Sequence, residues 1–207
     1  MNDLYKFENE LYLKGINYIG GVDEVGRGPL IGPVVAACVV LPKDFVLEGL
    51  TDSKKLSEKK RDLFYDYIIN HSIAYGVGII DAEIIDKVNI YEATKLAMKE
   101  AIKKVQKQIN LEHVLIDAMK LELNIPSTSI IKGDAKSISI AAASVVAKVT
   151  RDRMMYDLDK LYPEYGFAKH KGYPTKMHLE KLKEFGIIDG YRKSYGPVKN
   201  VLEGKNE

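Results

Sequence analysis

Two kinds of apolar pattern run along this chain and predict its strands and helices. Short apolar runs bounded by turn residues predict strands, and five such runs occur. They cover residues 17–25, 34–41, 72–80, 113–116 and 127–131. Apolar positions that recur every three or four residues predict helices. These cover residues 2–15, 58–70, 90–105, 135–161 and 175–185, with one helical turn at 81–86.

The residues at the ends of these segments support the boundaries. Ser57 and Thr175 are suitable N-caps for the helices that follow them, and Gly186 ends the last helix. The long helix is small and apolar on nearly every side in its first half, which predicts burial against the sheet. Its second half is charged. Both a continuous helix and a helix with one break fit this pattern. Residues 162–174 are predicted to form a loop, and a basic tail is expected after Gly190.

The order of the elements predicts an α/β fold. Three strands come first and are joined without a long crossover, so they should pair antiparallel, whereas the later strands follow a helix and should pair parallel. The result is a mixed five-stranded sheet flanked by helices, with a small C-terminal helical region. We place the main domain at residues 1–160 and the C-terminal region, packed on it, at residues 161–207.

Composition is that of an ordinary globular protein, and the charge is unevenly distributed. The chain has 207 residues, 46% of them apolar and 29% charged, with a net charge of +2. Residues 169–199 hold eight Lys or Arg against three Asp or Glu. This basic stretch is compatible with phosphate contacts, and equally with a solvated helix face.

Several classes of protein are not indicated by the sequence. The single cysteine, Cys38, lies in an apolar run and is expected to be buried, so no intrachain disulfide forms. The N-terminus is polar and acidic, which does not resemble a signal peptide. No apolar run approaches the ~18 residues of a membrane span. A cytoplasmic protein is therefore expected.

Three of the predicted strands end at or near a carboxylate. Asp23 and Glu24 close the first strand, Asp117 closes the fourth, and Asp134 follows the fifth. Ends of neighbouring strands lie about 5 Å apart, so these side chains should converge. Like charges so close repel each other unless cations lie between them. Asp134 alone has a simpler interpretation as a helix N-cap.

An all-oxygen cluster favours Mg²⁺ or Mn²⁺. Two such ions are the equipment for phosphoryl transfer, because one activates the attacking water and the other stabilises the leaving oxygen. The four histidines are scattered and form no zinc pattern. The glycines of the turn Gly26-Arg27-Gly28, directly after the first carboxylates, allow a close approach of the backbone to a ligand.

Six separated motifs resemble those of the bacterial ribonuclease HII family, in the family's order. They are residues 21–35 (GVDEVGRGPLIGPVV), 52–57 (DSKKLS), 115–117 (LID), 132–137 (KGDAKS), 142–148 (AASVVAK) and 171–173 (KGY). Aspartate as the fourth carboxylate and the roughly 16 residues before the first strand favour type HII over type HIII. Ala118 departs from the glycine that many members have after the third carboxylate.

This resemblance implies an RNase H-like fold and a divalent-metal-dependent endoribonuclease. Its substrates would be RNA–DNA hybrids and single ribonucleotides embedded in duplex DNA. Cleavage 5′ of the ribonucleotide by a metal-activated water would leave 3′-hydroxyl and 5′-phosphate ends. The metal-binding carboxylates of the family match Asp23, Glu24, Asp117 and Asp134.

The resemblance also implies how the substrate is recognised. Gly26, Arg27 and Gly28 would contact the ribose 2′-hydroxyl, and Tyr173 would pack on the sugar of the following deoxynucleotide. Other candidates have two interpretations: Lys54 and Lys55 are phosphate contacts or solvated surface, and Ser137 is a substrate contact or a helix cap. The charged residues that follow the buried half of the long helix, Lys148, Arg151 and Arg153, are expected to form structural ion pairs.

Two other activities fit parts of the pattern. A small-molecule phosphatase would use the same metal site but would show no preference for hybrid duplex. A noncatalytic nucleic-acid-binding module would bind without cleaving, and the presence of all four carboxylates counts against it. Under every interpretation, we expect a monomer without membrane contact.

Overall fold

The core of the protein is one mixed sheet of five strands. The computed structural model describes residues 4–51, 53 and 56–205. The strands are β1 (Ile19–Val25), β2 (Val34–Val40), β3 (Ala74–Ile80), β4 (His113–Asp117) and β5 (Ser127–Ile130). Their order across the sheet is β3-β2-β1-β4-β5. The first three pair antiparallel, and β4 and β5 extend the sheet in parallel, which confirms the predicted pairing.

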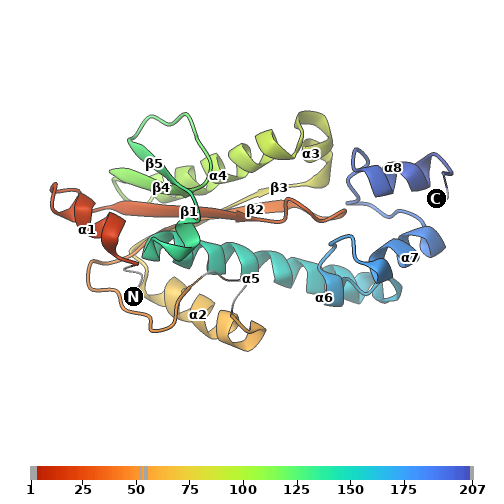
Figure 1. The fold of residues 1–207 in the computed structure, drawn as a ribbon, viewed down its shortest axis with the longest axis horizontal. Helices are drawn as coiled ribbons and strands as arrows, with labels where there is room; N and C mark the ends of the chain where they lie inside the picture. The colour runs from red at the N-terminus through yellow and green to blue at the C-terminus, as the bar shows by residue number, and fades with distance from the viewer. Residues whose placement is uncertain (1–3, 52, 54–55, 206–207) are drawn as a thin grey trace.

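Helices cover both faces of this sheet (Figure 1). On one face lie α3 (Ala82–Val88) and α4 (Ile90–Gln106); on the other lie α2 (Glu58–His71) and α5 (Ile138–Leu161). Each face buries its own apolar cluster between sheet and helices. The site is positioned by the second face, because α5 runs along β1 there.

The contact between β1 and α5 is made backbone against backbone. A side chain at Gly21 would place its Cβ 2.0 Å from the carbonyl carbon of Ser139, so only glycine allows this approach. The small residues of the first half of α5 are buried, as predicted. As a result, Ser144 and Lys148 of α5 lie beside the end of β1, in the same cavity as Asp23.

The first helix and the long helix differ in their boundaries from the prediction. The first helix, α1 (Lys6–Tyr12), is shorter than the predicted 2–15. The long helix begins at Ile138 rather than at 135 and has no break. The residues before it form a separate 3₁₀ turn, η2 (Gly133–Ala135). Short polar segments of this kind have no period that a sequence pattern detects.

The C-terminal region contains more helix than predicted. The expected loop at 162–174 holds η3 (Pro163–Tyr165) and α6 (Phe167–His170) before α7 (Lys176–Phe185), and the expected tail holds α8 (Gly196–Leu202). These short helices are stabilised by burial of their aromatic and apolar side chains in one cluster with Leu30, Ile31 and Met155. That cluster joins the region to the rest of the protein. The division into two domains at residue 160 stays a prediction.

The described part of the chain has no helix that combines the length and the apolar character needed to cross a lipid bilayer.

Candidate active site

The sheet brings the predicted carboxylates to one edge. Asp23 and Glu24 are the last polar residues of β1, and Asp117 ends the neighbouring parallel strand β4. The register pairs Val22 with Ile116, so Asp23 and Asp117 follow at the same level. Asp134 lies in η2, beyond the end of β5. The charges of Glu24, Asp117 and Asp134 all act on Asp23, so the four carboxyl groups lie at the same edge of the sheet.

Burial and mutual repulsion act on these carboxyl groups. Asp23 is 8% exposed, and its pKa is raised well above the usual range, first by burial and then by the charges of Glu24, Asp117 and Asp134. The Glu24 backbone N–H donates to Asp23 Oδ1 at 2.8 Å and offsets a small part of this. Burial also raises the pKa of Glu24, although Arg27 Nη1, 3.6 Å from Glu24 Oε1, opposes the shift. In both groups the surroundings therefore disfavour the charged form.

Asp117 is linked to the turn that carries Asp134. Its Oδ1 accepts a hydrogen bond of 2.6 Å from the Gly133 backbone N–H. The residue after it, Ala118, has φ 45°, in the left-handed region that glycine adopts without strain. Alanine there costs on the order of 1 kcal/mol. The departure noted in the sequence therefore affects the turn, and the carboxylate keeps its place.

The donor set can be compared with the needs of a divalent ion. Among the described residues, no three His, Cys, Asp or Glu side chains are placed to enclose a metal ion as they stand. The four carboxylates nevertheless offer only oxygen ligands and share an unbalanced negative charge around the buried Asp23. These properties fit Mg²⁺ or Mn²⁺. Binding would require the side chains to close around the ion.

A cavity of about 390 Å³ opens beside these carboxylates. Its walls combine acidic residues from the strand ends with basic and polar residues from the helices. The lining residues are Asp23, Glu24, Val25, Ser53, Arg61, Asp134, Ser144, Lys148 and Tyr173. A site of mixed charge next to a carboxylate cluster is suited to a ligand that carries both phosphate and metal.

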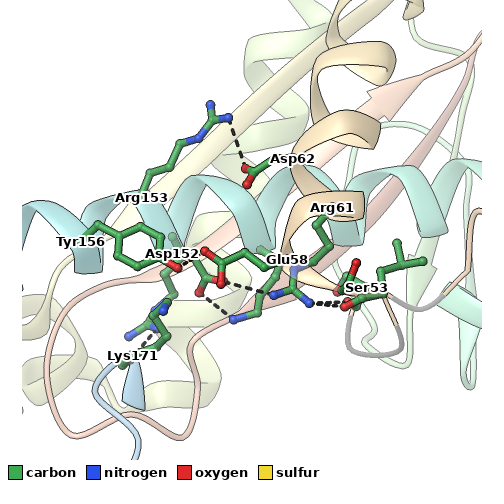
Figure 2. Close-up of polar contacts among 12 residues, drawn as sticks. Ser53, Glu58, Arg61, Asp62, Asp152, Arg153, Tyr156 and Lys171 are labelled. Carbon is green, nitrogen blue, oxygen red and sulfur yellow. Dashed lines mark hydrogen bonds and ion pairs between the residues drawn. The ribbon is translucent and has the colours of Figure 1, made fainter. Parts of the chain in front are cut away.

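The basic wall of the cavity belongs to an ion-pair network between α2 and α5 (Figure 2). Asp152 accepts from Lys148 Nζ at 2.6 Å and lies 3.9 Å from Arg61 Nη2. Arg61 also donates to the carbonyl oxygens of Ser53 and Leu56, at 3.1 and 2.6 Å. These contacts hold the Ser53 end of the predicted DSKKLS motif against the cavity. Lys54 and Lys55 lie outside the described residues.

The ion-pair predictions for the second half of α5 are confirmed at two positions and wrong at the third. Lys148 pairs with Asp152, and Arg153 Nη2 lies 3.4 Å from Asp62 Oδ1. Arg151, in contrast, has no exposed surface and donates only to backbone carbonyl oxygens. An amphipathic pattern does not reveal this difference, because a buried arginine satisfied by carbonyls has the same neighbours in sequence as a solvated one.

The two predicted recognition elements lie next to each other. A Cβ at Gly28 would be 3.5 Å from Tyr173 Cε1, so the Gly26–Gly28 turn touches the tyrosine that lines the cavity. The backbone of Tyr173 is held by His178, whose Nδ1 lies 2.9 Å from the Tyr173 carbonyl oxygen. His178 and His170 stack on each other with ring centroids 4.2 Å apart. These histidines have structural contacts, as expected, and support the Tyr173 segment.

Ser137 does not join the cavity. It is fully buried and caps α5, because its hydroxyl accepts from the Ile140 N–H at 3.2 Å. The same hydroxyl donates to Glu8 Oε1 at 2.5 Å, and Glu8 also accepts from the Ser139 N–H. The structure therefore supports the cap and not the substrate contact. Glu8, from the N-terminal helix, was not indicated by any motif.

The sequence matches one known protein family. The sequence model of Ribonuclease HII matches residues 20–195, from the first strand to the start of α8. The chain belongs to the ribonuclease HII family. A ribonuclease HII of Bacillus cytotoxicus is 58% identical over 203 residues, which cover 98% of this chain and 78% of the relative.

Solved structures agree with the fold of the ribonuclease HII family. The ribonuclease H2 of Pyrococcus horikoshii OT3 superposes with a TM-score of 0.76 at 25% identity, over 91% of this chain and 98% of that one. Bst-RNase HIII in complex with Mn²⁺ superposes with a TM-score of 0.70 at 17% identity, over 91% and 70%, and shows the fold alone. The predicted RNase H-like fold is confirmed.

Family membership also decides between the activities considered. As a member of this family, the protein is an endoribonuclease that hydrolyses the RNA strand of RNA–DNA hybrids. The phosphatase and the noncatalytic binding module are thereby set aside.

Proposed function

We propose that Asp23, Glu24, Asp117 and Asp134 hold Mg²⁺ or Mn²⁺ and that hydrolysis takes place at this cluster. The observation that carries the proposal is the buried Asp23, whose carboxyl pKa is raised by burial and by the charges of the other three carboxylates. Bound divalent ions would supply an activated water and stabilise the leaving oxygen. The structural relative crystallised with Mn²⁺ supports this choice of ion.

The residues of the chain orient the substrate around that cluster. Asp23 and Asp117 come from adjacent strands and therefore form a rigid base. Glu24 is held by Arg27, which belongs to the turn Gly26–Gly28, here called the recognition turn. The metal site and the recognition turn are therefore in direct contact. A phosphodiester in the cavity would meet the carboxylates at one wall and Tyr173 at another.

We infer that the recognition turn and Tyr173 select a ribonucleotide followed by a deoxynucleotide. The 2′-hydroxyl is the group that distinguishes RNA from DNA, and a glycine turn presents backbone groups to it without obstruction by side chains. The contact between Gly28 and Tyr173 supports the proposal, because two consecutive sugars would span these two residues. Single ribonucleotides in duplex DNA are then substrates as well as long hybrids, cut on the 5′ side to leave 3′-hydroxyl and 5′-phosphate ends.

We further infer a monomeric, cytoplasmic enzyme. The one cysteine, Cys38, is fully buried, which suits a reducing compartment. Light scattering at several protein concentrations tests the monomer, and a mass of 46 kDa, twice the 23.2 kDa of one chain, would contradict it.

The experiment is cleavage of a DNA duplex that contains one ribonucleotide, with and without Mg²⁺ or Mn²⁺. Asp23→Asn should lower kcat by about 100-fold or more, because metal ions contribute several kcal/mol to the transition state. Asp157→Asn is the matched control, since this exposed aspartate of α5 pairs only with Lys160 in the described part of the chain. Cleavage without metal, or equal cleavage by Asp23→Asn, would refute the proposal.

A further inference from the structure

Two arginines near the recognition turn are buried without a carboxylate partner. Arg151 and Arg192 have no exposed surface, and neither lies within 4.0 Å of an acidic side chain among the described residues. Removal of a guanidinium from water is costly, so a position that keeps one needs several hydrogen bonds in return. Both find most of them on the backbone of the segment between β1 and β2.

Arg192 binds the recognition turn itself. Its Nη2 donates to the Gly26 carbonyl oxygen at 2.6 Å, its Nη1 to the Arg27 carbonyl oxygen at 3.0 Å, and its Nε to the Gly32 carbonyl oxygen at 3.0 Å. Tyr195 adds a second donor, because its hydroxyl donates to the Arg27 carbonyl oxygen at 2.6 Å and accepts from Arg192 Nη1 at 3.0 Å. The carbonyl groups of the turn therefore point inward, toward Arg192 and Tyr195.

This orientation determines where the amide groups of the turn point. In a trans peptide unit, the N–H points opposite to the carbonyl group. Since the carbonyl groups of Gly26 and Arg27 face Arg192, the N–H groups of Arg27 and Gly28 point away from it. Neither N–H donates to another described residue. Two adjacent donors are thus left for a ligand, on a turn that touches Tyr173.

We propose that Arg192, together with Tyr195, is a positioning residue for recognition of the ribonucleotide. It holds the Gly26–Gly28 turn so that the N–H groups of Arg27 and Gly28 face the ribose 2′-oxygen. Arg192 does not touch the substrate and acts only through the turn. This inference rests on the proposed role of the turn in reading the 2′-hydroxyl.

The segment that carries Arg192 is itself fixed from two sides. Asp86 of α3 accepts from the backbone N–H groups of Lys193 and Ser194, at 2.8 and 2.9 Å. On the other side, the Arg192 N–H donates to the Leu30 carbonyl oxygen at 2.8 Å. Arg192 therefore links the recognition turn to a rigid part of the fold, which a positioning role requires.

Arg151 serves as an internal comparison. Its three donors bind the carbonyl oxygens of Pro33, Lys171 and Ile31, at 3.0, 3.0 and 3.1 Å. None of these contacts involves the carbonyl groups of Gly26 or Arg27. Arg151 thus stabilises the base of the loop and the Tyr173 segment, and the orientation of the two recognition amides falls to Arg192.

The test uses Tyr195→Phe and Arg192→Lys, with Tyr165→Phe as the matched control. Tyr165 lies in the same region and donates one comparable hydrogen bond, of 3.0 Å, to the Gly186 carbonyl oxygen, away from the recognition turn. For each protein, KM and kcat are measured on a duplex with one ribonucleotide. The inhibition constant of an all-DNA duplex of the same sequence and the melting temperature complete the set.

Tyr195→Phe should raise KM for the ribonucleotide duplex about three- to tenfold, the worth of one hydrogen bond, and leave the inhibition constant of all-DNA duplex unchanged. Arg192→Lys should reduce this discrimination further, because lysine cannot reproduce the planar fork of donors. Tyr165→Phe should change the melting temperature alone.

Tyr195→Phe could behave like Tyr165→Phe, with a lower melting temperature and an unchanged ratio of KM for the ribonucleotide duplex to the inhibition constant of all-DNA duplex. This result would overturn the inference while the proposed function stands. This outcome decides the matter even where Arg192→Lys fails to fold. A wild-type protein that cleaves the duplex but binds all-DNA duplex equally well would overturn both the role of the turn and that of Arg192.

Discussion

The loop between β1 and β2 separates two regions that bury charge of opposite sign with opposite results. At its start, burial raises the pKa values of Asp23 and Glu24, and neighbouring carboxylates raise them further. In the other region, Arg151 and Arg192 have no exposed surface, and each donates to three backbone carbonyl groups. Burial lowers the pKa of Arg151 to about 10, which leaves it charged at neutral pH.

The difference separates a site from a scaffold. A buried charge that the protein has already satisfied stabilises one arrangement of the chain and needs no ligand. A buried charge left unsatisfied costs stability until a ligand compensates it. Three measurements of stability test this difference.

Arg192→Met should give the largest loss. The substitution removes the cost of burying a charge, but it leaves the inward carbonyl groups of Gly26 and Gly32 without the Arg192 donor and that of Arg27 with Tyr195 alone. The free energy of unfolding should fall by about 3 kcal/mol or more in a urea titration. The control, Arg153→Met, removes a half-exposed arginine and should cost less than ~1 kcal/mol. Equal losses in the two variants would show that Arg192 is not a scaffold.

Lowering the pH should cause the second largest loss of stability. The group responsible is His178, whose ring contacts Tyr191, the residue before Arg192. Burial lowers the pKa of His178 to about 4, from the usual 6.5. The folded protein therefore binds fewer protons than the unfolded chain, and the stability from neutral His178 is full above pH 6.5 and lost as pH falls toward 4. The loss is at most about 3 kcal/mol. Urea titrations at pH 7 and 4.5 measure it.

His178→Gln should flatten this acid dependence, whereas His71→Gln, at an exposed histidine of α2, should leave it unchanged. The acid dependence would also weaken if the contacts of His178 with Tyr173 and Tyr191 tolerated a charged ring. A slope that survives in His178→Gln would refute the assignment.

Asp23→Asn should give the smallest effect and the opposite sign. A folded carboxyl group with a raised pKa contributes stability below its ordinary range and loses it as pH rises through the raised pKa. At neutral pH and without metal, Asp23→Asn should therefore unfold at a higher urea concentration than the wild type. Its free energy of unfolding should be greater by about 1 kcal/mol. Excess Mg²⁺ should stabilise the wild type and leave the variant unchanged. A destabilised variant in the absence of metal would contradict the comparison.

The sequence predicted one of these regions well and missed the other. The sequence pattern indicates the carboxylates because they lie at or after the ends of apolar strands. Sheet geometry brings the ends of neighbouring strands together independently of the loops. Arg192 falls in the predicted basic tail, and its sequence neighbours do not indicate its burial, which depends on Gly32, 160 positions away. Glu8 was missed for the same reason, because its partner Ser137 is 129 positions away.

Secondary structure followed the same rule. Strands and long helices were predicted because their period extends over several residues and N-caps such as Ser57 and Thr175 mark their starts. The short helices η3, α6 and α8 have too few residues for a period and exist through the apolar cluster they share with Leu30, Ile31 and Met155. Local pattern was sufficient where local forces dominate, and tertiary contacts decided the rest.

The metal ions are proposed to bind among the four carboxylates at the strand ends. Crystals soaked with Mn²⁺ and measured for anomalous scattering test this most directly. We expect a Mn²⁺ peak among Asp23, Glu24, Asp117 and Asp134 in the wild type, and its loss or marked weakening in Asp23→Asn. Absence of a peak at this cluster, or an equal peak in the variant, would contradict it.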